Sequence, residues 1–404
     1  DFVQGRFGHR GLSLAIAVTG MVAVLPYIAL QLVGMQVVFA AIGMNYMIAV
    51  PLLGQVSVPL VVAFAVLAGF TYTSGLRGTA LIAVVKDILV YITVLAAIII
   101  IPAELGGYSH VFAAMPAEKL TLAHAPEHSL GAGFSFVTLA AGSLLALFLY
   151  PHSVTGLLSS SSRHVIRRNA IVLPAYSVAL ALIALLGYMA VASGVNRMPE
   201  YAAGFKSFGN NFAVPALFLH MFPHWFAGLA FAAIAIGAMM PASIMAIACG
   251  NLFTRNIYKE FIAPDCTPQT EARMAKIVAF MAKLGALFFV LELQTTYAIQ
   301  LQLLGGIWIC QTVPAVLLAL YVRLDPRALL AGWAAGVGLG TWMVASLGFK
   351  SSTYPLHIAG WTIPCYAAVS ALAVNLVLSV VLTWVLKATT GMQTTDSTMA
   401  EDYV

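Results

Sequence analysis

The chain reads TALIAVVKDILVYITVLAAIIIIPA from residue 79 to residue 103. Lys86 and Asp87 are the only charged residues in this run. A helix crosses a bilayer with about 20 mostly apolar residues, so this stretch predicts a transmembrane span. Comparable stretches recur along the whole chain, and we predict ten spans in all. They lie at about 11–42, 47–73, 79–103, 132–157, 169–193, 225–252, 275–293, 298–322, 328–348 and 362–388.

The composition agrees with many spans. Hydrophobic residues make up 61% of the chain and charged residues only 8%, whereas an ordinary soluble domain has about 25% charged residues. A soluble core could not hide so much apolar surface, but a lipid bilayer can. The sequence therefore predicts an all-α polytopic membrane protein.

Lys and Arg cluster in alternate connections between the predicted spans. The richer set begins before the first span, and the positive-inside rule places it in the cytoplasm. Both ends of the chain are therefore predicted to be cytoplasmic, and residues 389–404 to form a disordered tail. The net charge of +5 follows from this topology rather than from a nucleic-acid partner. The richer set is Arg6, Arg10, Arg77, Arg163, Arg167, Arg168, Arg255, Lys259, Arg273, Lys276, Arg323, Arg327 and Lys387.

Four motifs follow one another at the ends of the predicted spans. They are Tyr72-Thr-Ser-Gly-Leu-Arg-Gly-Thr at a tight junction, Leu149-Tyr150-Pro151-His152 before a loop ending Arg167-Arg168-Asn169-Ala170, Phe253-Thr254-Arg255-Asn256-Ile257-Tyr258-Lys259, and Gly305-Gly306 with Pro314 before Tyr321-Val322-Arg323. In this order, and with this number of spans, they resemble the sodium/solute symporter family. The resemblance covers residues 1–388 and is greatest to the bacterial monocarboxylate-permease branch.

This resemblance implies a leucine-transporter-like fold, whose core is an inverted repeat of five plus five helices. Residues 1–388 match core helices three to ten and two peripheral helices, without the first helices of the family. Because the chain begins at Asp1 rather than Met, we expect an N-terminally truncated part of a longer protein. The location implied is the inner (plasma) membrane of a bacterium.

The function implied by the resemblance is secondary active uptake of small monocarboxylates or similar organic acids by alternating access. Three alternatives stay open: a sodium-coupled symporter of another substrate class, the input domain of a membrane sensor, and an inactive fragment. The sequence has no nucleotide-binding loop, catalytic triad or metal motif, so we predict no enzyme activity, cofactor or bound metal. The coupling ion is expected to be H⁺ or Na⁺.

Lys86 is the most informative residue of the third span, because a charge at the centre of a transmembrane helix costs about 2.5–3.5 kcal/mol on insertion scales. In the family that the chain resembles, a conserved Asp falls on Ala83 and a Gln on Lys86. We expect the Lys86 ammonium to replace a coupling sodium ion, and proton loss to remove its charge. The alternative is that Lys86 extends to water near the end of the helix. Asp87 lies about 100° further round the helix, so it need not pair with Lys86 and is expected to contact another helix.

The sixth span carries the second departure from the family. The cation ligands of sodium-coupled relatives fall on Gly237, Met240 and Pro241. A thioether and an imino acid are poor partners for a hard cation, which prefers oxygen. Ser243 lies two positions later, about 200° round the helix. The resemblance therefore argues against sodium coupling at this place.

Four residues are predicted to contact substrate. Tyr27 and Gln31 have i, i+4 spacing and would present a hydroxyl and an amide to a small carboxylate; the alternative is an interhelical hydrogen bond, worth about 0.6 kcal/mol. His152 follows a helix-breaking Pro151 and can titrate near neutral pH, or it caps the helix end. Gln302 falls on a substrate-contacting Gln of sugar-transporting relatives.

Overall fold

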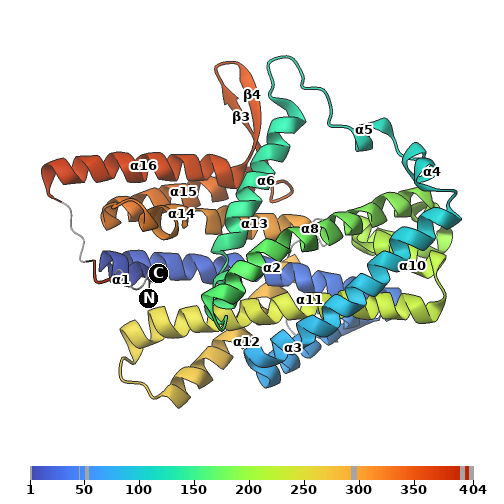
Figure 1. Ribbon diagram of the computed structural model, residues 1–404, viewed down its shortest axis with the longest axis horizontal. Coiled ribbons are helices and arrows are strands. Elements are labelled where there is room, and N and C mark those ends of the chain that lie inside the picture. The colour runs from blue at the N-terminus through green and yellow to red at the C-terminus, as the bar shows by residue number, and fades with distance from the viewer. Residues whose placement is uncertain (1, 45, 51–53, 293–297, 392–395, 400–404) are drawn as a thin grey trace.

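The protein is a bundle of long helices, several of which run along its longest axis (Figure 1). The computed structural model describes residues 2–44, 46–50, 54–292, 298–391 and 396–399. Within these residues, eight helices are long and apolar enough to cross a membrane. The long helices are α2 (Arg10–Ala41), α3 (Val58–Glu104), α6 (Gly131–Leu149), α8 (Arg163–Ala192), α11 (His224–Phe253), α12 (Pro268–Glu292), α15 (Pro326–Ser346) and α16 (Ala367–Thr389).

Two further apolar segments complete the match to the ten predicted stretches. One is the first half of α3, Val58–Thr73, which is shorter than the other spans. The second is a bent pair, Ile299–Cys310 and Val313–Leu320, whose axes differ by 50°. This pair comprises α13 (Ala298–Cys310), α14 (Val313–Val316) and the 3₁₀ turn η6 (Leu318–Leu320). Each of the ten predicted stretches thus contains a helix.

Short elements connect the long helices. The connections 104–131 and 194–224 contain short helices, and the chain after α11 continues as a π-helix. The helical connectors are α1 (Phe2–Phe7), α4 (Tyr108–Ala113), α5 (Ala117–Leu120), α7 (Pro151–Leu158), η1 (Val195–Arg197), η2 (Pro199–Tyr201), α9 (Ala202–Phe208), η3 (Gly209–Phe212), α10 (Ala213–Met221) and η4 (Thr254–Ile262).

Two antiparallel hairpins correct the predicted boundaries. The first pairs β1 (Met47–Val50) with β2 (Gly54–Ser57), so the predicted span 47–73 is wrong over its first part. The second pairs β3 (Thr353–Ile358) with β4 (Trp361–Tyr366), so the last span begins at Ala367 rather than near 362. Both hairpins contain enough apolar residues to be predicted as parts of helices, because a short apolar run alone does not distinguish a strand from a helix.

A glycine makes the tight junction within α3. Gly75 has φ 56° and ψ −161°, a conformation that only glycine adopts without strain. It divides the helix into Val58–Thr73 and the predicted third span, which runs from Gly75 to Glu104. The tight connection predicted from the sequence at this motif is confirmed.

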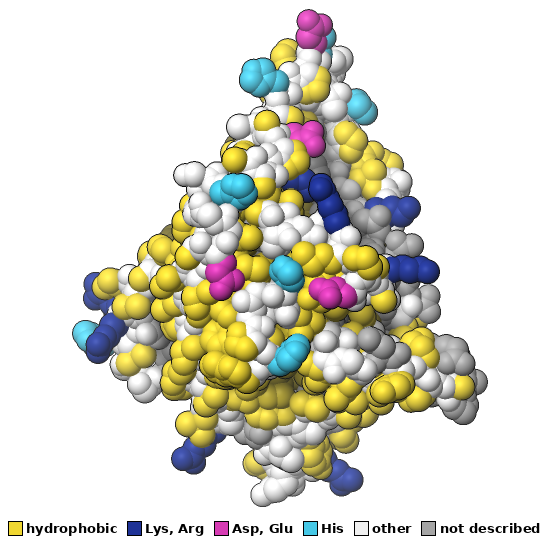
Figure 2. Space-filling model, turned by 90° about the vertical axis from the view of Figure 1, so that its right-hand side faces the viewer, with side chains coloured by type: hydrophobic (Ala, Val, Ile, Leu, Met, Phe, Trp, Pro, Cys, Tyr) yellow, Lys and Arg dark blue, Asp and Glu magenta, His cyan; other side chains and the backbone are white. Residues whose placement is uncertain are grey.

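Helix α2 lies at the centre of the bundle. It packs against α3, α11, α12 and α13 (Figure 1). Its residues Ala23, Ile28 and Leu32 are fully buried in the main hydrophobic core. Large apolar side chains such as Ile99 and Phe288 are exposed on the long helices, as the lipid-facing surface of a membrane protein must be. Figure 2 views the end of the bundle where α4 and α10 lie, and apolar side chains cover much of it. Its charged and histidine side chains are scattered rather than gathered into one face in that view.

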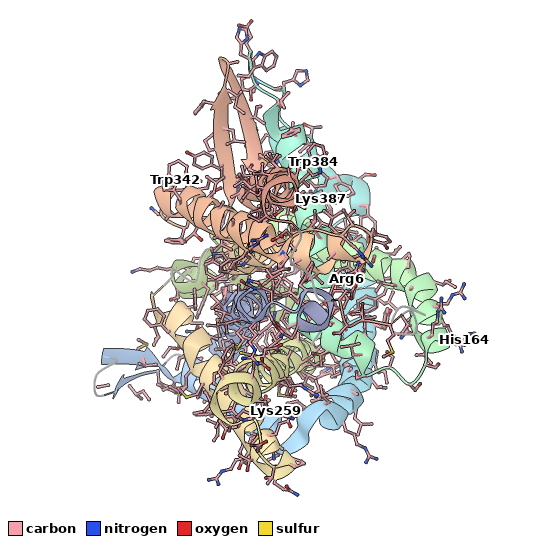
Figure 3. The ribbon with its side chains drawn as sticks, turned by 90° about the vertical axis from the view of Figure 1, so that its left-hand side faces the viewer. Arg6, His164, Lys259, Trp342, Trp384 and Lys387 are labelled. Atoms are coloured by element: carbon pink, nitrogen blue, oxygen red, sulfur yellow. The ribbon has the colours of Figure 1, made fainter. Side chains whose placement is uncertain are left out.

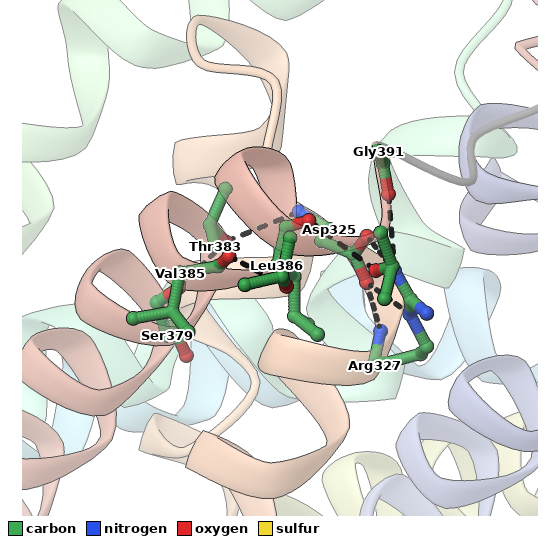
Figure 4. A network of polar contacts seen from close by, with 9 residues as sticks. Asp325, Arg327, Ser379, Thr383, Val385, Leu386 and Gly391 are labelled. Carbon is green, nitrogen blue, oxygen red and sulfur yellow. Dashed lines mark hydrogen bonds and ion pairs between the residues drawn. The ribbon is translucent and has the colours of Figure 1, made fainter.

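A buried carboxylate joins α15 to α16. Asp325 is 0% exposed and caps α15 by accepting a hydrogen bond from the Arg327 backbone N–H at 2.9 Å. It also pairs with the Arg327 guanidinium at 2.9 Å, and its own backbone N–H donates to Thr383 Oγ1 at 3.2 Å (Figure 4). Because a buried charge is costly without partners, this network fixes the α15–α16 pair.

Residues 396–398 of the predicted tail return to α1. The Ser397 backbone N–H and hydroxyl both bond to the Gly5 carbonyl at 2.9 Å, and Asp396 forms ion pairs with Arg6 and Arg323. Residues 392–395 and 400–404 lie outside the described residues, so the disorder predicted for them stays a prediction.

Asp396 gives this attachment a pH dependence. Hydrogen bonding from Thr398, with help from Arg6 and Arg323, lowers the pKa of Asp396 below its ordinary 3.8. A lowered pKa means that the contact persists above the ordinary pKa and is lost as the pH falls through the lowered value. We expect Asp396→Asn to accelerate amide hydrogen exchange at residues 396–399 at pH 7. Equal exchange in the variant and the parent protein would show that the ion pairs do not hold the tail.

Candidate functional site

A helix break places aromatic side chains inside the bundle. Helix α6 ends at Leu149 and α7 begins at Pro151, with Tyr150 between them at φ −58° and ψ 133°. Proline disfavours helical backbone in the residue before it, so the sequence Tyr150-Pro151 breaks the helix here. Tyr150 is only 2% exposed. The helix break therefore coincides with a buried tyrosine ring, that of Tyr150.

Three rings from two parts of the chain meet at this break. The Tyr27 ring of α2 lies 5.2 Å from the Tyr150 ring and 5.6 Å from the His152 ring, between centroids. Tyr150 and His152 are 5.3 Å apart. The Tyr150 hydroxyl donates to the backbone carbonyl of Gln302 in α13 at 3.1 Å. We call Tyr27, Tyr150 and His152 the aromatic cluster.

The cluster contains an unused hydrogen-bonding atom. The Nδ1 atom of His152 is buried and has no hydrogen-bond partner among the described residues. Buried polar atoms are nearly always paired, so an unpaired one requires an explanation such as a ligand. The imidazole can donate from either nitrogen, and a carboxylate can accept that bond. Three of the four predicted substrate residues meet here, with Gln302 contributing its carbonyl, whereas Gln31 is half-buried one turn beyond Tyr27.

A cavity of about 790 Å³ begins beside this break. It is lined by Leu149 and Pro151 on the two sides of Tyr150, and it reaches Phe2 and Val3 of α1. Its polar lining includes Ser13, Asn251 and Thr312. The cavity therefore joins the neighbourhood of the aromatic cluster to the end of the bundle that carries α1.

The second group of polar residues surrounds Lys86 on α3. The Lys86 side chain is 13% exposed, and its Nζ lies 2.8 Å from Asp87 Oδ1 and 5.8 Å from the centre of the Tyr176 ring of α8. Its Cγ would lie 3.9 Å from a Cβ added to Gly237 of α11. Lys86 thus runs along the predicted cation site and carries its charge between α3 and α8.

Proline exposes a carbonyl beside this lysine. Pro241 lies inside the continuous helix α11 and has no N–H to donate to the carbonyl four residues earlier, which belongs to Gly237. The carbonyl of Gly237 therefore lacks its usual partner on the same turn that faces Lys86. Met240 and Pro241 are both half-buried, and neither side chain offers an oxygen.

Ser243 contacts the first half of α3 rather than the half that carries Lys86. It is 0% exposed, and its hydroxyl lies 3.0 Å from the Thr71 hydroxyl in the first half of α3. Thr71 also donates to the Leu67 carbonyl at 2.8 Å. The two hydroxyls thus satisfy each other between α3 and α11, on another side of α11 from Gly237. Its predicted part in cation coupling stays a prediction.

One expectation about this group is wrong. Asp87 contacts Lys86 rather than another helix, because the long lysine side chain spans the turn of about 100° between neighbouring helical residues. Sequence reasoning also missed Tyr150, Tyr176 and Lys283. Lys283 of α12 is 1% exposed, and its charge inside an apolar span is the same signal that identified Lys86. Tyr150 was visible only as the residue before Pro151.

Comparisons with known proteins agree with this architecture. The model of the sodium:solute symporter family matches residues 1–336. A protein of Rhizobium johnstonii called "Monocarboxylate transport permease protein" is 47% identical over 395 residues, which cover 96% of this chain and 75% of that protein. A Bacillus subtilis protein called "Uncharacterized symporter YodF" is 28% identical over 341 residues, covering 84% of this chain and 65% of that protein.

A solved structure shares the fold. It is that of a Na⁺-coupled sialic acid symporter in a substrate-bound, outward-open state. The TM-score is 0.68 at 16% sequence identity, and the match covers 95% of this chain and 76% of that chain. At this identity the likeness concerns the fold alone. It establishes the leucine-transporter-like fold of this chain.

Proposed function

Because the chain belongs to the sodium:solute symporter family, as a multi-pass secondary active symporter and not an enzyme, we propose that it carries small monocarboxylates. The aromatic cluster is the observation that carries this proposal. It offers one buried nitrogen without a partner among the described residues, His152 Nδ1, beside two tyrosine rings at a helix break. Such a site suits a ligand with one carboxylate and a short carbon skeleton. The name of the Rhizobium relative supports the same class.

The cavity supplies the route by which the substrate leaves. It extends from Leu149 and Pro151, beside the cluster, to α1 at the end of the bundle. We place this end in the cytoplasm, and with it both ends of the chain, in the inner membrane of a bacterium. The positive-inside rule supports this orientation, as does the presence of Arg6, Lys259 and Lys387 on the face that carries α1 (Figure 3).

His152→Ala tests the substrate site. Loss of a hydrogen bond to a charged group costs about 1.5–3 kcal/mol, so we expect the KM for lactate to rise about 10- to 150-fold. The measurement is uptake of radiolabelled lactate into liposomes that contain the purified protein. His164→Ala is the matched control, because His164 is exposed on the same stretch of chain. An unchanged KM in the His152 variant would remove the cluster from the substrate site.

We further propose that protons, through Lys86, drive this transport. The largely buried side chain of Lys86 passes Gly237, whose carbonyl is left without its usual donor by Pro241, and its ammonium ends beside Asp87 and Tyr176. A fixed ammonium on α3 supplies a positive charge like that of a sodium ion. A lysine releases that charge by losing a proton, which couples the site to the proton gradient. Neither Met240 nor Pro241 provides the side-chain oxygen that a sodium ion prefers.

A further inference from the structure

The Tyr150 hydroxyl ties the aromatic cluster to a second helix, α13. It donates to the Gln302 carbonyl at 3.1 Å, one turn before Gly305 and Gly306. A Cβ on Gly305 would lie 2.6 Å from this hydroxyl and 2.3 Å from the Ala23 carbonyl of α2. Glycine is thus required where α2, the α6–α7 break and α13 meet. At this junction a ring that contacts Tyr27 and His152 also bonds to α13.

Helix α13 in turn forms part of the cavity wall. Ile309 near its end, Thr312 at the bend and Val316 of α14 all line the cavity. The bend of 50° between Ile299–Cys310 and Val313–Leu320 separates the part held by Tyr150 from the part that forms the wall. A movement of α13 at Gly305 therefore changes the shape of the cavity.

A second tyrosine holds α13 without touching the cluster. The Tyr366 hydroxyl donates to the Leu303 carbonyl at 2.6 Å, and a Cβ on Gly306 would lie 2.4 Å from that hydroxyl. Tyr366 is 0% exposed and ends β4, far from the helix break in sequence. Two tyrosine hydroxyls thus lie against Gly305 and Gly306. Of these two tyrosines, Tyr150 has ring contacts with Tyr27 and His152, and Tyr366 has none among the described residues.

We propose that Tyr150 is a positioning residue that couples substrate occupancy of the aromatic cluster to the position of α13. With the cluster empty, its hydroxyl holds α13 at Gln302. A substrate that engages Tyr27 and His152 displaces the Tyr150 ring, and the bond to α13 is released. Tyr366 serves only to anchor the helix. The coupling to substrate, though not the bond itself, rests on the proposed substrate site.

A cysteine at the cavity wall reports the position of α13. The background is Cys266→Ser with Val316→Cys, because the native Cys249, Cys310 and Cys365 are buried. The rate of maleimide labelling is measured in liposomes with and without lactate. Without lactate, Tyr150→Phe should change the rate about fivefold, as loss of one neutral hydrogen bond allows. Tyr366→Phe is the matched control and should leave the effect of lactate on the rate intact.

The outcomes separate the two proposals. In the background protein lactate should change the labelling rate, and in Tyr150→Phe it should have no further effect. The inference is overturned if Tyr150→Phe labels at the background rate without lactate, or if lactate still changes its rate normally. Should lactate leave even the background protein unaffected, the substrate class would be wrong. The labelling rates of the background protein and of Tyr150→Phe without lactate would then decide whether the bond from Tyr150 holds α13.

Discussion

Replacing Lys86 by arginine should reduce proton-driven uptake to the level of protein-free liposomes. Arginine keeps the positive charge but cannot lose its proton in a protein, so the site can no longer follow the proton gradient. Lys86→Met removes the charge altogether and should also abolish accumulation. The measurement compares lactate uptake into liposomes under an inwardly directed proton gradient with lactate uptake in the absence of any gradient.

Lys276→Arg is the matched control for this substitution. Lys276 also lies on a long helix, and its Nζ is 5.1 Å from the centre of the Tyr72 ring, but it is not near Gly237. We expect this variant to transport like the parent protein. Undiminished proton-driven uptake in both Lys86 variants would rule out the Lys86 mechanism, while leaving the symporter assignment intact.

Gly250→Ala should destabilise the bundle more than most single substitutions. A Cβ on Gly250 would lie 2.4 Å from the Ala275 carbonyl oxygen and 3.1 Å from its carbon. Both atoms belong to the backbone of α12, so the helices must move apart. Overpacking of this kind costs about 1–3 kcal/mol or more, and we expect a lower Tm and a lower yield of folded protein in detergent.

Gly228→Ala on the same helix separates packing from helix propensity. Nothing lies within 4 Å of a Cβ at Gly228, and alanine favours a helix over glycine by about 1 kcal/mol. This variant should therefore melt at or slightly above the Tm of the parent protein. If the Gly250→Ala variant had the same Tm as the Gly228→Ala variant, the close contact between α11 and α12 would be contradicted.

The spans could be predicted because the bilayer imposes a simple rule on the sequence. About 20 apolar residues are needed per helix, and each of the ten predicted stretches contains a helix. Two residue types also have their usual effects on the backbone. Gly75 adopts a positive φ, and Pro151 follows a break in the helix. The four strands β1 to β4 were missed because apolar content alone does not reveal strand pairing.

The site was harder to predict because it depends on contacts between distant segments. Tyr27 and His152 could be named from their positions beside prolines, but their meeting through Tyr150 depends on how α2 packs on the α6–α7 break. Lys86 was found because a charge in an apolar span is costly. The same reasoning applied to Lys283 would have found a second buried lysine.

The most direct test of the proposed coupling uses the unmodified protein in sodium-free liposomes that enclose a pH-sensitive dye. A proton gradient is imposed, and lactate accumulation and luminal pH are followed together against protein-free liposomes. Proton coupling through a buried lysine predicts accumulation without sodium, accompanied by faster acidification of the lumen than lactate produces in the protein-free liposomes. Accumulation that appears only when sodium is added, with no proton movement, would contradict it.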